Sequence, residues 1–426
     1  MSMMSSMNGA RWWKLALPIA LFVSLVAGCG GQSPGAGTTA APMRAAAPAQ
    51  WRRVNPPPGA SKLASLAVSP VNGADAWDCE SVDPYTYLIW ATTDAGAHWR
   101  QVGTLVASHE ANATPPVYCR LYTDQANPQV LAADFLYLPR PPDPTIPAGY
   151  DLSYLSQDGG ATWRPVPGKT QIEALTTSGP SLYALVDDTS VAAFMPHLVV
   201  SADSLQTWQT LPLPAASANG ASTSGKVNRL YGARGADGVI VSADGLPLEH
   251  LNASARAWTP IHLPPLTTRE NEGLQLPITW LPAQHTWMIC IGALNFATIP
   301  PRTGLLRCTT DDGATWRDRP FPTDASGAPL QAANSDWACV PSALTNDGAL
   351  LAWCETTAAH LTPDAPPIPP AKPGHLLRLA LSSSQWVDLG PLGGGNIGIS
   401  AKGQVVWNAG DYDTAWVADL SVLPTQ

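Results

Sequence analysis

Charged side chains are scarce in this sequence, and their scarcity excludes several classes of protein. Asp, Glu, Lys and Arg together make up 13% of the 426 residues, too few for a protein built from long solvent-exposed helices. Runs of Lys or Arg are absent, and the formal net charge at pH 7 is −9. We therefore expect no nucleic acid among the partners and no attraction to anionic lipid through basic residues.

The usual sequence patterns of metal sites are absent as well. None of the seven cysteines forms a C-x-x-C pair, and the eight histidines show no spacing typical of metal ligands. We expect neither a metal ion nor a cofactor.

The apolar run at the N-terminus is too short for an ordinary spanning helix. It extends from Leu15 to Ala27 and follows Arg11 and Lys14, so residues 1–28 are typical of an export signal. Residues 25–29 (LVAGC) resemble the bacterial lipobox, in which small residues precede a lipidated Cys. The resemblance implies a lipoprotein, held by lipid on Cys29 at a membrane surface outside the cytoplasm, either on the cell surface or on the periplasmic face. The alternative is a soluble secreted protein cleaved nearby.

Residues 29–49 have the composition of a linker. They are built from Gly, Ala, Pro, Ser and Thr without aromatic residues, and we expect a flexible tether. The folded part then extends over residues 50–423.

Proline, glycine and tryptophan are abundant, with 43, 35 and 17 residues, which indicates short strands joined by turns and almost no helix. A chain of this length contains either two domains or a repeat array. A Trp that opens a short strand returns seven times, at spacings of 45 to 70 residues: Trp51, Trp99, Trp163, Trp208, Trp258, Trp316 and Trp386. Repeats of this size are typical of propeller blades.

The order of the repeats predicts how the ring closes. Each module begins with a hairpin (strands A and B), continues with strand C and ends with the Trp strand, D. The first Trp strand, at Trp51, has no A, B or C before it, whereas the last module, residues 396–420, has no D after it. We expect an all-β, seven-bladed β-propeller of four-stranded antiparallel blades, closed by the N-terminal strand and present as a monomer.

A turn element of the form S-x-D-x-G-x-T-W precedes several of the Trp strands. Its best copy is residues 156–163, and further copies are residues 92–99, 201–208 and 309–316. The Asp can accept backbone N–H groups and the Gly can adopt a left-handed conformation, so we assign these residues a structural role: Asp94, Gly96, Trp99, Asp158, Gly160, Thr162, Trp163, Asp203, Trp208, Asp311, Gly313, Thr315 and Trp316. The element resembles the Asp-box of BNR-repeat, sialidase-like propellers, over about residues 50–423.

The resemblance implies where catalytic residues would lie. Sialidases use an arginine triad, a Tyr–Glu pair and an Asp, with an Arg-Ile-Pro segment near the first blade. Residues 56–67 contain no Arg-Ile-Pro. Arg120 and Arg229 are the arginines on expected A strands, with Glu173 and Tyr231 as companions, whereas three arginines are needed. The alternative is that these four residues line the channel and satisfy one another.

Long insertions are expected on one face of the propeller. They fall in B–C loops (Pro139–Gly149, Ala293–Gly304 and Thr356–Gly374) and in D–A loops (Leu213–Lys226, Pro264–Gly273 and Pro322–Ser335). Because this face lies opposite the Asp-box turns, we expect a surface-anchored, non-catalytic binding or assembly module that recognises a protein or glycan through the B–C/D–A face. The alternative function is a divergent, exo-sialidase-like glycoside hydrolase acting on surface glycans.

Six cysteines remain once Cys29 carries lipid, and in an exported protein an even number indicates three disulfides among 15 pairings. The blade register favours bonds between neighbouring blades, namely Cys79–Cys119, Cys290–Cys339 and Cys308–Cys354. Sequential pairing is the alternative.

Overall fold

The fold was described from a computed structural model of the chain. It describes residues 44–45, 49–110, 113–138, 149–189, 196–212, 227–236, 238–243, 248–252, 257–264, 274–295, 302–322, 337–356, 374–391, 398–402, 405–409 and 415–420. The expected export signal and Cys29 lie outside these residues.

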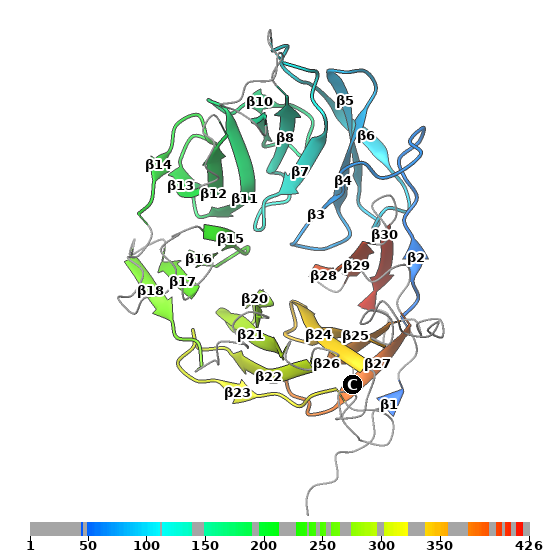
Figure 1. The fold of residues 1–426 in the computed structure, drawn as a ribbon, viewed down its shortest axis with the longest axis vertical. Helices are drawn as coiled ribbons and strands as arrows, with labels where there is room; N and C mark the ends of the chain where they lie inside the picture. Colours follow the sequence, from blue (N-terminus) through cyan, green and yellow to red (C-terminus); the bar gives the residue numbers. More distant parts are fainter. Residues whose placement is uncertain are drawn as a thin grey trace, which may run out of the picture. The chain divides into compact units, whose positions relative to one another are not determined.

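The described residues form seven sheets around a common centre (Figure 1), so the predicted seven-bladed, all-β propeller is confirmed. Strands A to D of each blade run from the centre outward. Blade 1 contains β3 (Ala67–Val68), β4 (Ala76–Ser81), β5 (Thr86–Thr92) and β6 (Arg100–Val106); blade 2 contains β7 (Cys119–Thr123), β8 (Leu131–Tyr137), β9 (Tyr150–Ser156) and β10 (Arg164–Pro165). Blade 3 contains β11 (Thr170–Ser178), β12 (Ser181–Asp188), β13 (His197–Ser201) and β14 (Gln209–Thr210).

The remaining four blades repeat this pattern. Blade 4 contains β15 (Val227–Tyr231), β16 (Val239–Ala243), β17 (Leu248–Asn252) and β18 (Ala257–Ile261); blade 5 contains β20 (Ile278–Leu281), β21 (Thr286–Asn295), β22 (Arg302–Thr309) and β23 (Arg317–Asp318), with β19 (Leu274–Gln275) also paired to β21. Blade 6 contains β24 (Trp337–Leu344), β25 (Leu350–Thr356), β26 (His375–Leu379) and β27 (Trp386–Pro391); blade 7 contains β28 (Gly398–Lys402), β29 (Val405–Ala409) and β30 (Ala415–Asp419).

The N-terminal strand closes the ring, as predicted. Strand β2 (Arg52–Arg53) pairs antiparallel with β30 and supplies the outer strand of blade 7. A second strand, β1 (Arg44–Ala45), was not expected: it pairs in parallel with β27 and adds a fifth strand to blade 6. The segment expected to be a flexible tether therefore ends in residues that pair with a blade.

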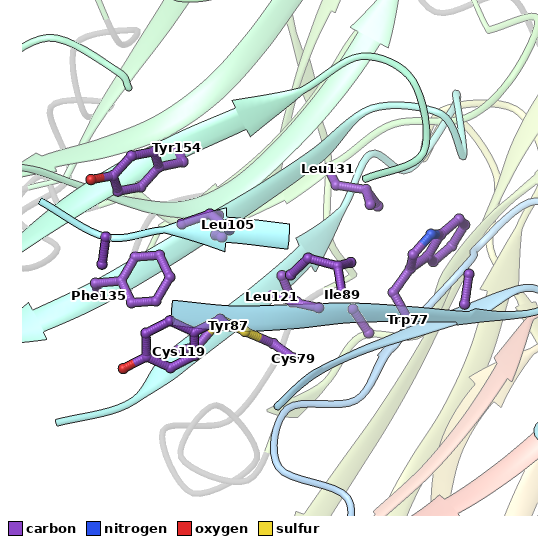
Figure 2. Close-up of a cluster of buried hydrophobic side chains, with 14 of the residues drawn as sticks. Trp77, Cys79, Tyr87, Ile89, Leu105, Cys119, Leu121, Leu131, Phe135 and Tyr154 are labelled. Atoms are coloured by element: carbon purple, nitrogen blue, oxygen red, sulfur yellow. A yellow bond between two sulfur atoms is a disulfide. The ribbon is translucent and has the colours of Figure 1, made fainter. Parts of the chain in front are cut away.

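The core lies between neighbouring blades. Figure 2 shows the cluster between blades 1 and 2, where Trp77 and Ile89 of blade 1 face Leu131, Phe135 and Tyr154 of blade 2. Alternate residues of each strand point toward the blade on either side. Burial of these large side chains from both sheets holds the two blades together.

The Asp turns make the hydrogen bonds that their residue types suggest. In blade 2, Oδ1 of Asp158 accepts the N–H of Thr162 at 2.9 Å, and Oδ2 accepts its hydroxyl at 2.6 Å. Asp203 and Asp311 bind Thr207 and Thr315 in the same way, whereas Asp94 binds the backbone and ring of His98.

The turns also pack against the preceding blade. A methyl group on Gly96, which has a φ of 77°, would lie 2.4 Å from Val54 Cγ1, and one on Gly313 would lie 2.8 Å from the carbonyl oxygen of His262. Leu205 takes the glycine position in the third blade with a φ of 59° and is fully buried. The turn therefore tolerates a side chain where that side chain enters the core.

Several D-strand tryptophans link neighbouring blades by hydrogen bonds. The indole N–H of Trp99 donates to the carbonyl of Asn55, that of Trp316 to His262 and that of Trp386 to Pro320. Each acceptor lies just beyond the D strand of the preceding blade. These tryptophans therefore hold the blades in place.

The disulfides correct part of the sequence prediction. Cys79–Cys119 joins blades 1 and 2, as predicted, but the pairings Cys290–Cys339 and Cys308–Cys354 are wrong. The observed bonds are Cys290–Cys308 and Cys339–Cys354. In each of these two pairs the cysteines stand directly opposite each other on adjacent strands of one blade, with Cα atoms 4.1 Å and 4.0 Å apart. Side chains at such positions approach closely enough to bond without any movement of the blades.

Candidate functional site

The structure brings together two of the four residues singled out in the sequence. Arg120 on β7 and Glu173 on β11 meet at the seam between blades 2 and 3, near the ends of the strands that lead to the B–C and D–A loops. Arg229 and Tyr231 lie on β15 in blade 4, and Tyr231 lines a separate cavity at the centre of the ring. The four predicted residues therefore lie at two separate places, one pair at the seam and the other pair on β15.

Arg120 lies nearest to the carboxylates of the seam among the described arginines. Its guanidinium donates to the hydroxyl of Tyr122 at 3.3 Å and lies 5.0 Å from the centre of the Tyr118 ring. Partial burial lowers the pKa of Arg120, but the bond to Tyr122 and the nearby Asp134 outweigh it, so that the pKa lies above its ordinary value. The charge of Arg120 is thus fixed at all physiological pH values.

Asp134 on β8 is fully buried and bonded within the seam. Its Oδ2 accepts the N–H of Ile172, from blade 3, at 3.1 Å. The hydroxyl oxygen of Ser153 lies 2.5 Å from Oδ1 of Asp134 and 2.5 Å from the carbonyl oxygen of Thr170.

These contacts bear on the protonation of Asp134. The hydroxyl of Ser153 carries one proton, so it donates either to Asp134 or to the carbonyl of Thr170, and in the second case only a protonated Asp134 can bond to it. Complete burial raises the pKa of Asp134 well above its ordinary value, which agrees with a protonated carboxyl. Asp134 is therefore a buried link between blades 2 and 3, in a setting that favours its neutral form.

Asp151 on β9 is buried but incompletely bonded. It is 5% exposed, and no hydrogen-bond partner within the described residues reaches its Oδ1. Burial raises the pKa of Asp151 to about 6; Arg120 opposes this change, and Glu173 and Asp187 add to it. Asp151 therefore changes charge close to neutral pH.

Glu173 stands at an irregularity of its strand. The register between β11 and β12 shifts between Ile172 and Ala174, so Glu173 is the extra residue of a β-bulge, a feature that redirects a side chain. Burial raises its pKa, Arg120 lowers it and Asp187 raises it. The seam thus gathers Asp151, Glu173 and Asp187 around one arginine.

Sequence reasoning missed Asp134 and Asp151. Each is an acidic residue inside a strand that is otherwise largely buried, in LAADFLY and YDLSYLS. A carboxyl at such a position is costly unless it is bonded or functional, and this was the signal available in the sequence.

The arginine triad of a sialidase is not assembled in the part of the chain that the structure describes. Arg120 interacts electrostatically with the carboxylates Asp151 and Glu173 of the seam. Arg229 lies two blades away from Arg120, at an exposed position of β15. Most of the six predicted long loops lie outside the described residues. Within those residues, no group of three or more His, Cys, Asp or Glu could hold a metal ion, and no helix is long and apolar enough to cross a bilayer.

Comparison with known proteins finds similar solved structures but no relative in sequence. No protein-family model and no curated protein sequence matches the chain. Among solved structures, YCF48 bound to D1 peptide is 14% identical, with 89% of this chain and 99% of that chain covered and a TM-score of 0.47. The GH74 xyloglucanase from Xanthomonas campestris is 17% identical, with 88% of this chain and 54% of that chain covered and a TM-score of 0.48.

A third similar structure is the PL25 ulvan lyase bound to -[GlcA(1-4)Rha3S]-, which is 10% identical, with 88% of this chain and 98% of that chain covered and a TM-score of 0.43. The structures similar to this chain thus include both a peptide-binding protein and glycan-acting enzymes. At these identities the likeness assigns no activity.

Proposed function

We propose that this protein is an extracytoplasmic, lipid-anchored binding module that recognises a protein partner through its B–C/D–A face, where the seam between blades 2 and 3 receives a basic side chain. The observation that carries the proposal is the unpartnered Oδ1 of buried Asp151, beside Glu173 and a single arginine. A lysine or arginine of a partner would supply the hydrogen bonds and the positive charge that these carboxylates lack.

Export is supported by the three disulfides, because such bonds persist in oxidising compartments. Attachment through Cys29 rests on the lipobox-like residues 25–29.

A binding assay with cationic and neutral peptides tests the seam directly. Labelled hexalysine and its fully acetylated form would be titrated against the full mature chain, and fluorescence anisotropy would be measured at pH 5 and pH 7.5. We expect hexalysine to bind more tightly at pH 7.5, because Asp151 is then ionised, and the acetylated peptide to bind at least about tenfold more weakly.

Substitutions in the seam provide the controls. The double variant Asp151→Asn/Glu173→Gln should lose about tenfold in affinity, whereas Arg120→Gln should bind hexalysine more tightly because it removes the competing cation. Glu80→Gln, on β4 in blade 1, changes one carboxylate of another blade and should leave binding unaltered. Equal binding of acetylated and free hexalysine, or of the double variant and the wild type, would contradict the proposal.

A second function is favoured by one specific observation. A carboxyl with a pKa of about 6, such as Asp151, has the property required of a general acid in a glycoside hydrolase. A panel of fluorogenic glycosides tests this alternative: turnover that is lost in Asp151→Asn but retained in Glu80→Gln would replace the binding function by catalysis.

A further inference from the structure

A cavity of about 390 Å³ lies at the centre of the ring on the opposite, A–B side. Its described lining comes mainly from the A–B turns or adjoining strand ends of five blades, including Pro70 of blade 1, Gln125 of blade 2, Tyr231 of blade 4, Pro282 of blade 5 and Asn346 of blade 6. The strands that lead to these turns are the innermost strands of their blades, as Figure 1 shows for β3, β7, β15, β20 and β24. A cavity of this size is large enough for a small ligand.

One wall of the cavity is aromatic. Trp280 on β20 packs edge to face against Trp287 on β21, with ring centres 5.3 Å apart, and both rings line the cavity together with Tyr231. Trp287 is 2% exposed, and no described group accepts its indole N–H. Because Trp287 is buried, the aromatic surface that a ligand would meet comes mainly from Trp280 and Tyr231, with Trp287 packed behind them.

The wall is held in position from across the ring. The side-chain amide of Gln125 donates to the carbonyl of Leu230 and accepts the N–H of Gly232, both at 2.7 Å. This pair of bonds ties blade 2 to the end of β15 on both sides of Tyr231. The aromatic surface is therefore formed before any ligand arrives, which lowers the entropic cost of binding.

The rim of the cavity carries an unpaired positive charge. Arg234, in the turn after β15, is exposed and has no hydrogen-bond or ion-pair partner among the described residues. Of the lining residues that the structure describes, none carries a carboxylate. In a chain with a formal charge of −9, this part of the surface is suited to an anion.

The balance of donors and acceptors narrows the ligand class. The described lining carries one cation, Arg234, and the hydroxyl and amide groups of Tyr231, Thr279 and Asn346 can donate or accept, whereas the carbonyl oxygen of Gln125 is already bonded to Gly232. Sugar hydroxyls and peptide N–H groups carry no negative charge to pair with Arg234. A flat ring bearing a carboxylate needs only donors and an aromatic surface.

We propose that the A–B side of the propeller centre is a binding site for a small aromatic carboxylate, whose ring lies against Trp280 and Tyr231 and whose carboxylate is held by Arg234. Arg234 is placed to form a bidentate, charge-assisted pair with the carboxylate at the rim. The site is independent of the seam between blades 2 and 3, and the two proposals fail separately.

Calorimetric titration of the full mature chain with three probes tests the ligand class. We expect 2-naphthoate to bind with a stoichiometry of one. Its neutral analogue 2-naphthamide should bind at least about tenfold more weakly, because the charge-assisted pair is lost, and glucuronate should also bind more weakly, because it lacks the flat ring. Absence of naphthoate binding, equal binding of the amide, or tighter binding of glucuronate would each overturn the proposal.

Matched variants locate the site. Arg234→Gln should weaken naphthoate binding about tenfold or more, and Arg234→Lys should restore part of it. Trp280→Leu keeps an apolar side chain but removes the flat surface, and it should also weaken binding, with circular dichroism to establish that the variant is folded. Arg100→Gln, on the outer strand β6, should bind as the wild type does. Unchanged affinity in Arg234→Gln, or an equal loss in Arg100→Gln, would contradict the assignment.

Discussion

Two regions of the propeller differ in the sign of the charge that is in excess. The seam between blades 2 and 3 has an excess of carboxylates, whereas the cavity on the A–B side has an excess of positive charge. In the seam, Asp151, Glu173 and Asp187 lie around Arg120, and burial raises the pKa of Asp151 and of Glu173. At the cavity, Arg234 stands at the rim without a carboxylate among the described lining residues. The same strand scaffold thus gathers carboxylates on one side and carries an exposed guanidinium on the other.

This difference also concerns stability. Asp134 in the seam is buried and accepts a hydrogen bond from the neighbouring blade, so altering it affects folding. Arg234 is exposed, so its removal affects ligand binding alone. Substitutions that separate folding from binding therefore test the contrast between the two regions.

The largest effect is expected at Asp134. Asp134→Ala leaves the buried N–H of Ile172 without its partner and removes one of the two partners of the Ser153 hydroxyl, and it should lower the free energy of unfolding by about 3 kcal/mol. Asp134→Asn can accept from Ile172 through its oxygen and donate to Ser153 through its nitrogen, as the protonated carboxyl does. It should cost less than about 1 kcal/mol in urea unfolding at pH 7. A large loss in Asp134→Asn would show that the carboxyl is ionised.

A smaller effect is expected from the pH dependence of Asp151. Its pKa of about 6 in the folded state lies above the unfolded value of about 3.9. The folded state therefore keeps a proton that the unfolded state loses, and stability falls as pH rises from about 4 to about 6, by on the order of 2 kcal/mol. Asp151→Asn should flatten this part of a chemical-denaturation profile, leaving the contribution of Glu173. A slope equal to that of the wild type would contradict the assignment of Asp151.

The smallest effects are expected from the two arginines. Arg234→Gln should change the free energy of unfolding by less than about 0.5 kcal/mol. Arg120→Gln should lower it at pH 7 by about 1 kcal/mol and move the Asp151 transition to higher pH, because Arg120 lowers the pKa of that group. Urea denaturation of both variants at pH 5 and pH 7 measures the change in the free energy of unfolding. A larger change in Arg234→Gln than in Arg120→Gln would contradict the expected difference between the two regions.

The architecture could be predicted from the sequence because it depends on repeated local patterns. Seven Trp strands and one displaced terminal strand fix the number of blades and the closure of β2 on β30. The disulfides within blades 5 and 6 could not be predicted, since they depend on strand register: Cys290 faces Cys308, and Cys339 faces Cys354. The order of strands does not reveal which residues stand opposite each other.

The candidate site was predicted in part for a related reason. Arg120 and Glu173 were found because they lie on innermost strands, which any propeller brings close together. Asp134 and Asp151 acquire their importance from contacts across the seam, such as the bond from Ile172 to Asp134. The cavity at Arg234 depends on how five turns meet, which no single stretch of sequence encodes.

The pairing of β1 with β27 and of β2 with β30 has a mechanical consequence. Any tension applied to the N-terminus reaches β1 first and then β2, each of which is held by the register of only two residue pairs. Because β2 is the outer strand of the last blade, extracting it would open the ring between its first and last modules. These two short strands would have to separate from their partners one after the other. The force needed to separate them would set the tension at which the propeller opens.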